Sequence, residues 1–372
     1  MTSNDLPRNS LLSAELLPDP RLASFDERRL GLLLHGAVDP MVPQRRTLTR
    51  QHYFLYPEEL HRPGLERDQP HRGLLSFVVQ APGDPTPYAI VHGRLFDGGF
   101  DTGILAIARE EAKEAFFLRE GGGGIASFDL QPACRGGCAF CPRTRSGAAR
   151  RRSWLESATE ADAVRAFMLR YERHTLASLD QISIVTGRFA NEAKFVAHVM
   201  ALLNAALSHG FQGDLYFASD QLVHPDAMEQ VRAAAPRRVY YAVTIESFSR
   251  RAALMPTRAD VDWRSILEHA KRIFGRAYYN LILGLEPLAD VIEGIDALAP
   301  VATPYISVFC VYSRAQEAMR AEGANQLVYY QQVQRLLLRR FGREAYMHDA
   351  PHFNVSNRAL LPYPADRFAP WS

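Results

Sequence analysis

The sequence predicts an α/β protein built around a partial (βα)6 barrel of the TIM type, with an N-terminal α+β extension and a C-terminal tail or lid. Two observations predict this architecture. From about residue 125, short β-rich runs alternate with longer stretches of helical periodicity. Such alternation indicates a parallel sheet with its helices outside. There are six such units, which suit an open barrel better than a closed barrel of eight.

The predicted strands are short runs rich in β-branched and aromatic residues, at 125–131, 182–187, 214–220, 239–247, 277–286 and 304–312. The predicted helices follow them at 159–173, 191–209, 225–235, 262–274, 288–299 and 325–341. In the last helix, Leu327, Tyr330, Val333 and Leu337 form one stripe, and Asn325 is the expected N-cap.

Composition is that of a globular protein without an obvious polyanionic partner. The 372 residues are 47% hydrophobic and 23% charged, and the formal net charge is +2. No apolar run approaches the length of a membrane span, and the first residues lack the pattern of a secretory signal. We therefore expect a cytoplasmic protein that binds no membrane.

Three regions are expected along the chain. Residues 1–120 form an accessory region, 121–320 the barrel, and 321–372 a C-terminal helix and tail that close the barrel. Within the accessory region, residues 72–118 are interpreted as strands followed by a helix at 105–118. The accessory region is the expected addition for substrate recognition or oligomer formation.

The tail contains a short polar group, made of His348, Asp349, His352 and Asn354. These residues could supply acid–base groups over the barrel mouth. A hydrogen-bonded wrap of the C-terminus explains them as well and is slightly favoured.

Three of the four cysteines lie on one loop after the first strand, at Cys134, Cys138 and Cys141. Four cysteines do not make a disulfide framework, and a structural zinc site needs a fourth ligand that the neighbouring sequence lacks. Three thiolates are suited to a 4Fe–4S cluster with one iron left open. Gly136 and Gly137 allow the positive φ angles that such a wrapped loop needs.

The loop has the spacing CxxxCxxC, with Phe140 before the last cysteine. With this motif after the first strand, the chain resembles the radical S-adenosylmethionine superfamily over roughly residues 120–320. The resemblance implies that Cys134, Cys138 and Cys141 hold a 4Fe–4S cluster. It further implies that the open iron binds S-adenosylmethionine, which an external one-electron reductant of the flavodoxin or ferredoxin type helps to cleave. The resulting 5′-deoxyadenosyl radical would take a hydrogen atom from the substrate.

The resemblance also assigns roles at the ends of the second and third strands. In "TGRFANE", Gly187 matches the family's turn, and Glu192 would hold the methionine amino group from a displaced position. The alternative for Glu192 is an ordinary acidic first turn of a helix. Ser219 and Asp220 end the third strand and are further candidates for cofactor binding.

After the fourth strand, Glu246 and Ser247 would face the ribose and methionine parts of S-adenosylmethionine. Arg258 would pair with the methionine carboxylate, with Arg250 and Arg251 as rivals that solvated helix positions explain equally well.

The fifth strand resembles the family's adenine-binding pattern. Ile282 would pack on the adenine and Gly284 would give it room, although Ile282 also suits a barrel core. Two positions depart from the pattern: Asn280 replaces a glycine, and Glu286 comes one residue early.

The fourth cysteine, Cys310, is placed in the middle of the sixth strand. A buried apolar role is the more common one for a free cysteine. The sharper hypothesis is that Cys310, or Tyr312 on the same face, donates a hydrogen atom to a substrate radical.

These expectations define a radical enzyme acting on a small molecule or a peptide, through a rearrangement, lyase or epimerase step in bacterial specialised metabolism. No second cysteine cluster or cobalamin pattern is present, which disfavours an auxiliary cluster and cobalamin-dependent methylation. One alternative is a radical lyase acting on nucleic acid, because residues 141–154 are rich in arginine. The other is a non-enzymatic zinc scaffold. Substrate and oligomeric state stay open.

Overall fold

The computed structural model describes residues 20–42, 49–61, 74–80, 86–109, 117–118, 123–128, 134, 136–141, 159–258, 261–311 and 314–345. Its larger unit is a seven-stranded sheet in the order β13-β12-β11-β10-β9-β8-β7. The strands are β7 (Phe117–Leu118), β8 (Gly124–Phe128), β9 (Gln181–Ile184), β10 (Asp214–Ser219), β11 (Val239–Glu246), β12 (Tyr278–Leu283) and β13 (Thr303–Val308).

The strands β8 to β13 are all parallel, and each pairs with the next one along the chain. The short edge strand β7 is antiparallel to β8. The sheet does not close on itself. The predicted partial (βα)6 barrel is therefore confirmed, and the carboxyl ends of its strands share one edge.

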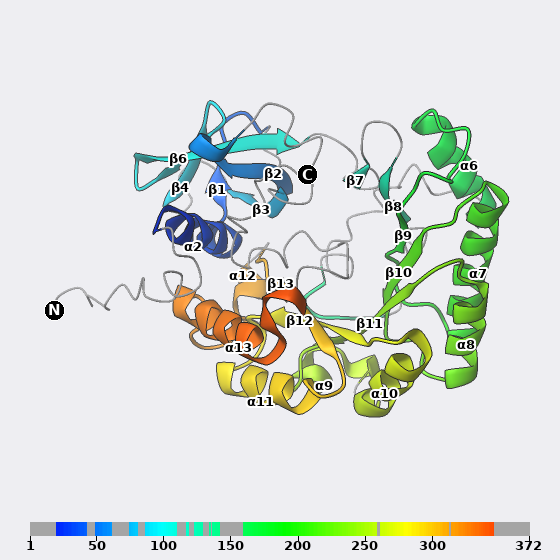
Figure 1. Cartoon of the computed structure of the whole chain (residues 1–372). Helices are drawn as coiled ribbons and strands as arrows, with labels where there is room; N and C mark the ends of the chain where they lie inside the picture. Colours follow the sequence, from blue (N-terminus) through cyan, green and yellow to red (C-terminus); the bar gives the residue numbers. More distant parts are fainter. Residues whose placement is uncertain are drawn as a thin grey trace.

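Helices cover the outer side of this sheet (Figure 1). They are α6 (Glu160–Arg170), α7 (Glu192–Ser208), α8 (Pro225–Ala234), α10 (Trp263–Phe274), α11 (Leu288–Leu298) and α13 (Leu327–Ala345). Short elements stand at the strand ends: α9 (Arg251–Leu254), the 3-10 turn η3 (Pro256–Arg258) and α12 (Arg314–Glu317). All six predicted helices are confirmed to within a few residues, but the last begins at Leu327, two residues after the expected cap.

Local sequence explains where the helices begin. Thr159, Asn191 and Asp262 each cap a helix by accepting a hydrogen bond from a backbone N–H of the first turn. Helix α8 instead begins with Pro225, whose missing N–H costs nothing at that position.

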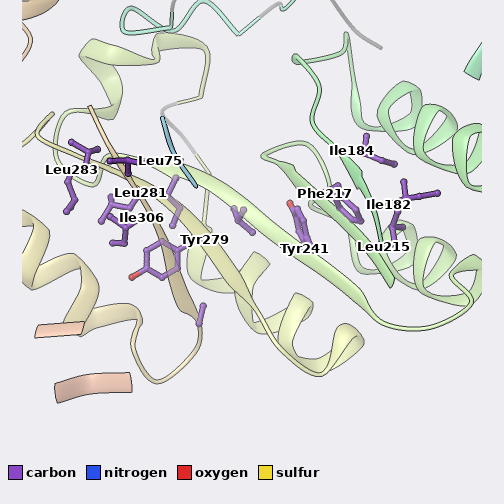
Figure 2. Close-up of a cluster of buried hydrophobic side chains, with 14 of the residues drawn as sticks. Leu75, Ile182, Ile184, Leu215, Phe217, Tyr241, Tyr279, Leu281, Leu283 and Ile306 are labelled. Atoms are coloured by element: carbon purple, nitrogen blue, oxygen red, sulfur yellow. The ribbon is translucent and has the colours of Figure 1, made fainter. Parts of the chain in front are cut away.

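The outward strand positions are large and apolar, and they form the core beneath the helices. Ile182, Phe217, Tyr241 and Leu281 are among them, and each is at most 1% exposed (Figure 2). Burying such a side chain contributes roughly 1.5–3 kcal/mol. Because side chains alternate along a strand, the polar and small residues between them face the inside of the curved sheet.

The N-terminal unit is a helix on a small closed β-barrel in the strand order β1-β3-β2-β6-β5-β4. Its elements are α2 (Pro20–His35), β1 (Ala37–Val38), β2 (Thr49–Pro57), η1 (Glu58–Leu60), β3 (Leu74–Gln80), β4 (Tyr88–Val91), β5 (Arg94–Asp97) and β6 (Phe100–Arg109). The expected α+β character is confirmed. Helix α2 lies against α13 of the larger unit.

The helix predicted at 105–118 is wrong at both ends, because Leu105 to Arg109 continue strand β6 and Phe117–Leu118 form strand β7. Ile104 and Ala106 alternate inward, and β6 pairs along its length with β2 and β5. Pairing on both sides outweighs the helix propensity of the Ala- and Glu-rich segment. Residues 110–116 lie outside the described ones.

None of the described helices is long and apolar enough to cross a membrane.

Candidate functional site

The cysteine loop leaves β8 at the carboxyl edge of the parallel sheet, where ligands bind in such folds. The Cys134 sulfur accepts two backbone hydrogen bonds, from the N–H of Gly136 at 3.3 Å and from that of Arg188 at 3.2 Å. Gly137 has φ +62°, and a Cβ placed on it would meet no atom within 4 Å, so its role is the turn itself. The N–H of Cys141 donates to the carbonyl of Cys138 at 3.2 Å, which closes a tight turn.

The loop is anchored by segments far away in the sequence. The Thr257 hydroxyl donates to the carbonyl of Gly136 at 2.9 Å, and the N–H of Ala139 donates to the carbonyl of Leu254. The Gln316 side chain donates to the carbonyl of Phe140 at 3.1 Å. Loops after β8, β11 and β13 are thereby joined at one edge.

An apolar wall supports this edge. Phe140 and Cys138 are buried in one cluster, and Cys141 and Ile282 pack against it. Besides Ala139 of the loop itself, the other members come from the segments that follow β11, β12 and β13: Leu254, Met255, Leu285, Phe309, Val311 and Met319. The structure thus brings the predicted residues Phe140 and Ile282 together with two of the three cysteines.

Arg188 links the ends of three strands. Its N–H binds the Cys134 sulfur, and its guanidinium lies 3.6 Å from the Asp220 carboxylate. The same guanidinium donates to the carbonyl of Thr257 at 3.2 Å. Gly187, which directly precedes Arg188, therefore lies beside the cysteine loop, and Asp220 is linked to that loop through the Arg188 side chain. The Ser219 hydroxyl accepts from the N–H of Gln221.

Glu192 is engaged by the loop after β10. One carboxylate oxygen accepts the N–H groups of Val223 at 2.6 Å and His224 at 2.9 Å. The other bonds to the imidazole of His224. These contacts, together with the Asn191 cap, support the helix-start alternative, and the cofactor role of Glu192 stays a prediction.

The end of β11 has an unusual backbone. Glu246 has φ +69°, and the pairing with β12 shifts register between Thr244 and Glu246. A left-handed non-glycine residue at a strand end is characteristic of functional sites. Its neighbour Ser247 is fully buried, and the Ser247 hydroxyl donates to Glu286 at 2.8 Å.

The arginines of this segment differ in their surroundings. Arg250 donates to the carbonyls of Leu285 and Met319. Arg251 is buried, donates to the carbonyl of Ile245 and lies 4.0 Å over the ring of Trp263. Both therefore hold loops together, and the side chain of Arg258 lies outside the described ones.

Gly284, after β12, has φ +97°. A Cβ there would lie 2.9 Å from the Tyr330 hydroxyl, so only glycine lets α13 approach. The carbonyl of Gly284 also accepts from the N–H of Ala321. The close packing of α13 therefore explains why this position is a glycine. The predicted role of Gly284, to give room for an adenine, is a second explanation.

The sequence-based placement of Cys310 is wrong by two residues, because β13 ends at Val308. Cys310 is 7% exposed as a residue, and its thiol donates to the carbonyl of Val308 at 3.5 Å. Burial is the main cause that raises the pKa of the Tyr330 phenol on α13, and Cys310 is a smaller contributor. Tyr312 and the tail residues His348, Asp349, His352 and Asn354 lie outside the described residues.

Among the residues that the structure describes, no three His, Cys, Asp or Glu side chains are gathered closely enough to hold a metal ion, and this covers the three loop cysteines. The chemistry of the donor set nevertheless fits an iron–sulfur cluster. Three thiols share one loop, and the Cys134 sulfur accepts two backbone N–H groups, the kind of bond that tunes such clusters.

Sequence reasoning missed four residues of this edge: Arg188, Thr257, Gln316 and, in its observed role, Glu286. Arg188 directly follows Gly187 at the end of β9, and that position was a usable signal. For Thr257 the sequence offered no such signal, because its hydrogen-bond partner Gly136 lies 121 residues away.

No protein-family model and no curated protein sequence matches this chain. Among solved structures it is similar to Streptococcus suis SuiB bound to S-adenosylmethionine, with a TM-score of 0.35 and 11% identity over 50% of this chain and 39% of SuiB. It is also similar to methylornithine synthase (PylB), with a TM-score of 0.40 and 11% identity over 64% of this chain and 69% of PylB. These values are low, so the fold assignment rests on the order and direction of β8 to β13 in this chain.

Proposed function

We propose that this chain is a radical S-adenosylmethionine enzyme. One observation carries the proposal: the three-cysteine loop follows the first strand of an open parallel barrel and lies at its carboxyl edge. The two N–H bonds to the Cys134 sulfur and the apolar wall around Cys138 support it. A zinc scaffold would need a fourth ligand, and the sequence at 129–158 around the loop contains no further cysteine and no histidine.

In this proposal Cys134, Cys138 and Cys141 hold a 4Fe–4S cluster. When bound, the cluster and S-adenosylmethionine supply a 5′-deoxyadenosyl radical that takes a hydrogen atom from the substrate. The apolar wall of Phe140 and Ile282 would shield that edge from water.

The remaining predicted residues would orient S-adenosylmethionine from the neighbouring strand ends, as the resemblance implies. They are Gly187, Glu192, Ser219, Asp220, Glu246, Ser247, Arg258, Ile282 and Gly284. Arg188 joins them as a residue that positions Cys134 through its backbone and Asp220 through its guanidinium.

The reaction is proposed to be a rearrangement, elimination or epimerisation of a small molecule or peptide, with an external one-electron reductant. Cys310 and Tyr312 are the hydrogen donors that the resemblance suggests for such a step. The division into 1–120, 121–320 and 321–372 is kept as the proposed assignment of accessory, barrel and closing regions.

The test is anaerobic reconstitution with iron and sulfide, followed by reduction in the presence of S-adenosylmethionine and assay of 5′-deoxyadenosine. The wild-type protein should bind about four irons and form 5′-deoxyadenosine. Replacing any one of Cys134, Cys138 and Cys141 by Ala should abolish 5′-deoxyadenosine formation. Cys310→Ala is the matched control for iron content, because that thiol lies outside the loop.

The zinc alternative gives a different result in the same experiment. A protein that takes up one zinc per chain, rejects iron and sulfide, and keeps its fold only with zinc would be a scaffold. A reconstituted cluster that binds S-adenosylmethionine but cleaves it with none of several reductants would also contradict the proposal.

A further inference from the structure

The chain that follows β9 still bridges the two neighbouring strands after β9 itself has ended. Strand β9 lies between β8 and β10 in the sheet and ends at Ile184. Beyond that point, the N–H of Arg188 donates to the Cys134 sulfur at 3.2 Å, on the side of β8. The next residue, Phe189, is bound on the side of β10 by the side chain of Gln221. A side chain on each side thus replaces the backbone of a neighbouring strand.

Gln221 binds Phe189 through two hydrogen bonds. Its Oε1 accepts the N–H of Phe189 at 2.6 Å, and its Nε2 donates to the Phe189 carbonyl at 3.1 Å. A side-chain amide carries a donor and an acceptor side by side, so it can bind both backbone groups of one residue, as a paired strand does. Successive N–H groups of an extended chain point to opposite edges. Holding Phe189 towards β10 therefore directs the N–H of Arg188 towards Cys134.

Both partners of this pair are fixed by their surroundings. Gln221 is 6% exposed, and its own N–H donates to the Ser219 hydroxyl at 3.0 Å. The Phe189 ring packs on α7, with its centroid 6.0 Å from that of Phe195 and 4.9 Å from that of His198. A buried amide whose oxygen and nitrogen are both hydrogen bonded has little freedom to turn. The direction of the Arg188 N–H is thus set by packed parts of the barrel.

The side chain of Arg188 secures the same place from another direction. Its guanidinium lies 3.6 Å from the Asp220 carboxylate and donates to the carbonyl of Thr257 at 3.2 Å. The Thr257 hydroxyl donates to the Gly136 carbonyl at 2.9 Å, and the N–H of Gly136 is the second donor to the Cys134 sulfur, at 3.3 Å. Both backbone donors to this sulfur therefore belong to one circuit of hydrogen bonds.

We propose that Gln221 is a positioning residue that keeps the Arg188 N–H on the Cys134 sulfur through Phe189, and thereby raises the reduction potential of the cluster bound there. The inference rests on the proposed function for the presence of that cluster. Reduction adds negative charge to the cluster and its sulfur ligands, and an N–H group aimed at a sulfur stabilises this charge. A donor that is already in place does so without reorganisation when the electron arrives.

The first test uses the full chain free of cluster, so its outcome does not depend on radical chemistry. Hydrogen-exchange mass spectrometry follows peptides that cover residues 185–190. Gln221→Met keeps the length of the side chain and removes both hydrogen bonds, so the backbone N–H groups of Arg188 and Phe189 should exchange about 10-fold faster than in the wild type. If Gln221→Met does not fold, Gln221→Glu keeps the acceptor and should give about 3-fold faster exchange. Unchanged exchange would overturn the inference.

The matched control is the same substitution at a buried glutamine on the other end of β9. Gln181 is fully buried at the start of that strand, and its Nε2 donates to the Ser183 hydroxyl at 2.8 Å. Gln181→Met also removes a buried hydrogen bond, but it lies away from the cysteine loop. It should therefore leave the exchange of residues 185–190 unchanged, even where it lowers the stability of the protein.

The second test measures the midpoint potential of the reconstituted cluster by a redox titration followed with EPR. Gln221→Met should make the reduced state about 3- to 10-fold less favourable relative to the oxidised state, a decrease of about 30–60 mV at 59 mV per tenfold for one electron. Gln181→Met should keep the wild-type potential, so a merely structural effect is recognised.

The outcomes separate this inference from the proposed function. A cluster that forms in Gln221→Met and keeps the wild-type potential would overturn the inference, even if 5′-deoxyadenosine is still formed. A wild-type protein that takes up no iron and sulfide would instead contradict the proposed function and with it the effect on the potential. The exchange experiment would still decide whether Gln221 holds the Arg188 N–H in place.

Discussion

At the scale of single residues, Glu286 organises the loop after β11. One of its carboxylate oxygens accepts from Ser247 Oγ, Phe248 N and Ser249 N at 2.8 Å each, and from Ser249 Oγ at 3.2 Å. The side chain is fully buried, and its other oxygen has no hydrogen-bond partner among the described residues. Glu286 therefore fixes the loop that follows Glu246 and precedes the anchors of the cysteine loop.

Glu286→Ala should lower the free energy of unfolding by about 3 kcal/mol, because it leaves several loop donors without an acceptor. Glu286→Gln keeps an acceptor oxygen at the same place and should stay within about 1 kcal/mol of wild type. Chemical denaturation measures both, with exposed Glu229→Ala as the control for a simple loss of charge. Equal destabilisation by the Ala and Gln variants would show that charge, and not hydrogen bonding, holds the loop.

For Cys310, burial and the hydrogen bond of its thiol to the carbonyl of Val308 favour the core alternative over the hydrogen-donor hypothesis. Cys310→Ala should cost about 1 kcal/mol of stability. It should leave the ratio of substrate product to 5′-deoxyadenosine unchanged, as measured by chromatography once a substrate is known. Normal 5′-deoxyadenosine with product lost, and with no deuterium transferred from D2O, would instead support a donor role.

The residues of the candidate site could be predicted only where chemistry is written in a short stretch of sequence. Three thiols within eight positions need no structure to suggest a cluster. Thr257 and Arg188 act through backbone groups that are distant in sequence, and no local pattern encodes such pairs. The resemblance predicts that Glu192 binds the methionine amino group of S-adenosylmethionine. Its hydrogen bonds to the loop after β10 could not be predicted, because they depend on where that loop lies.

At the scale of elements, the packing of α6 against α7 contains an ionisable pair made of a buried histidine and a partly exposed glutamate. His198 Nδ1 lies 2.8 Å from Glu160 Oε1, and its ring lies 4.9 Å from that of Phe189. Burial lowers the pKa of His198 below its usual value, and Glu160 opposes this to a smaller extent. The folded protein therefore binds the His198 proton more weakly than the unfolded chain does.

Stability contributed by neutral His198 should be present above the unfolded pKa of about 6.5 and be lost as pH falls through the folded value. Denaturant unfolding at several pH values between 7.5 and 5 measures this loss. His198→Gln cannot take up the proton and should lose less stability than wild type over that range. Exposed His174→Gln is the control and should follow wild type. A steeper loss in His198→Gln would contradict the assignment.

The helices and strands of the larger unit were predictable because the hydrophobic periodicity and the length of each segment indicate the same kind of element. Every strand from β8 to β13 is followed by a stretch of helical periodicity, and parallel pairing of neighbours is the simplest outcome. The small N-terminal barrel was not predictable in detail. Its strands pair β1 with β3 and β4, so the closure depends on contacts between segments that are far apart in the sequence.

At the scale of the whole molecule, charge helps to distinguish a nucleic-acid substrate from a small molecule or a peptide. The net charge of the chain is +2, so there is little excess positive charge for binding a polyanion. Nucleic-acid enzymes neutralise several phosphates with Lys and Arg, which makes their affinity fall steeply with salt. In this chain the arginine-rich segment 141–154 is the feature that could serve that purpose.

A 20-nucleotide single-stranded DNA or RNA should bind more weakly than about 100 μM at physiological salt, because one short basic segment neutralises too few phosphates. Fluorescence anisotropy between 50 and 300 mM salt measures this. Replacing Arg150, Arg151 and Arg152 by Gln should then change the affinity for nucleic acid little. The same should hold for the control variant, in which Gln replaces three arginines that are exposed on helices: Arg232, Arg272 and Arg339. Micromolar binding with a steep salt dependence, lost in the first triple variant and kept in the second, would identify 141–154 as a phosphate-binding segment. Such a result would favour a radical lyase acting on nucleic acid over an enzyme that acts on a small molecule or a peptide, because this basic segment directly follows the cysteine loop in the sequence.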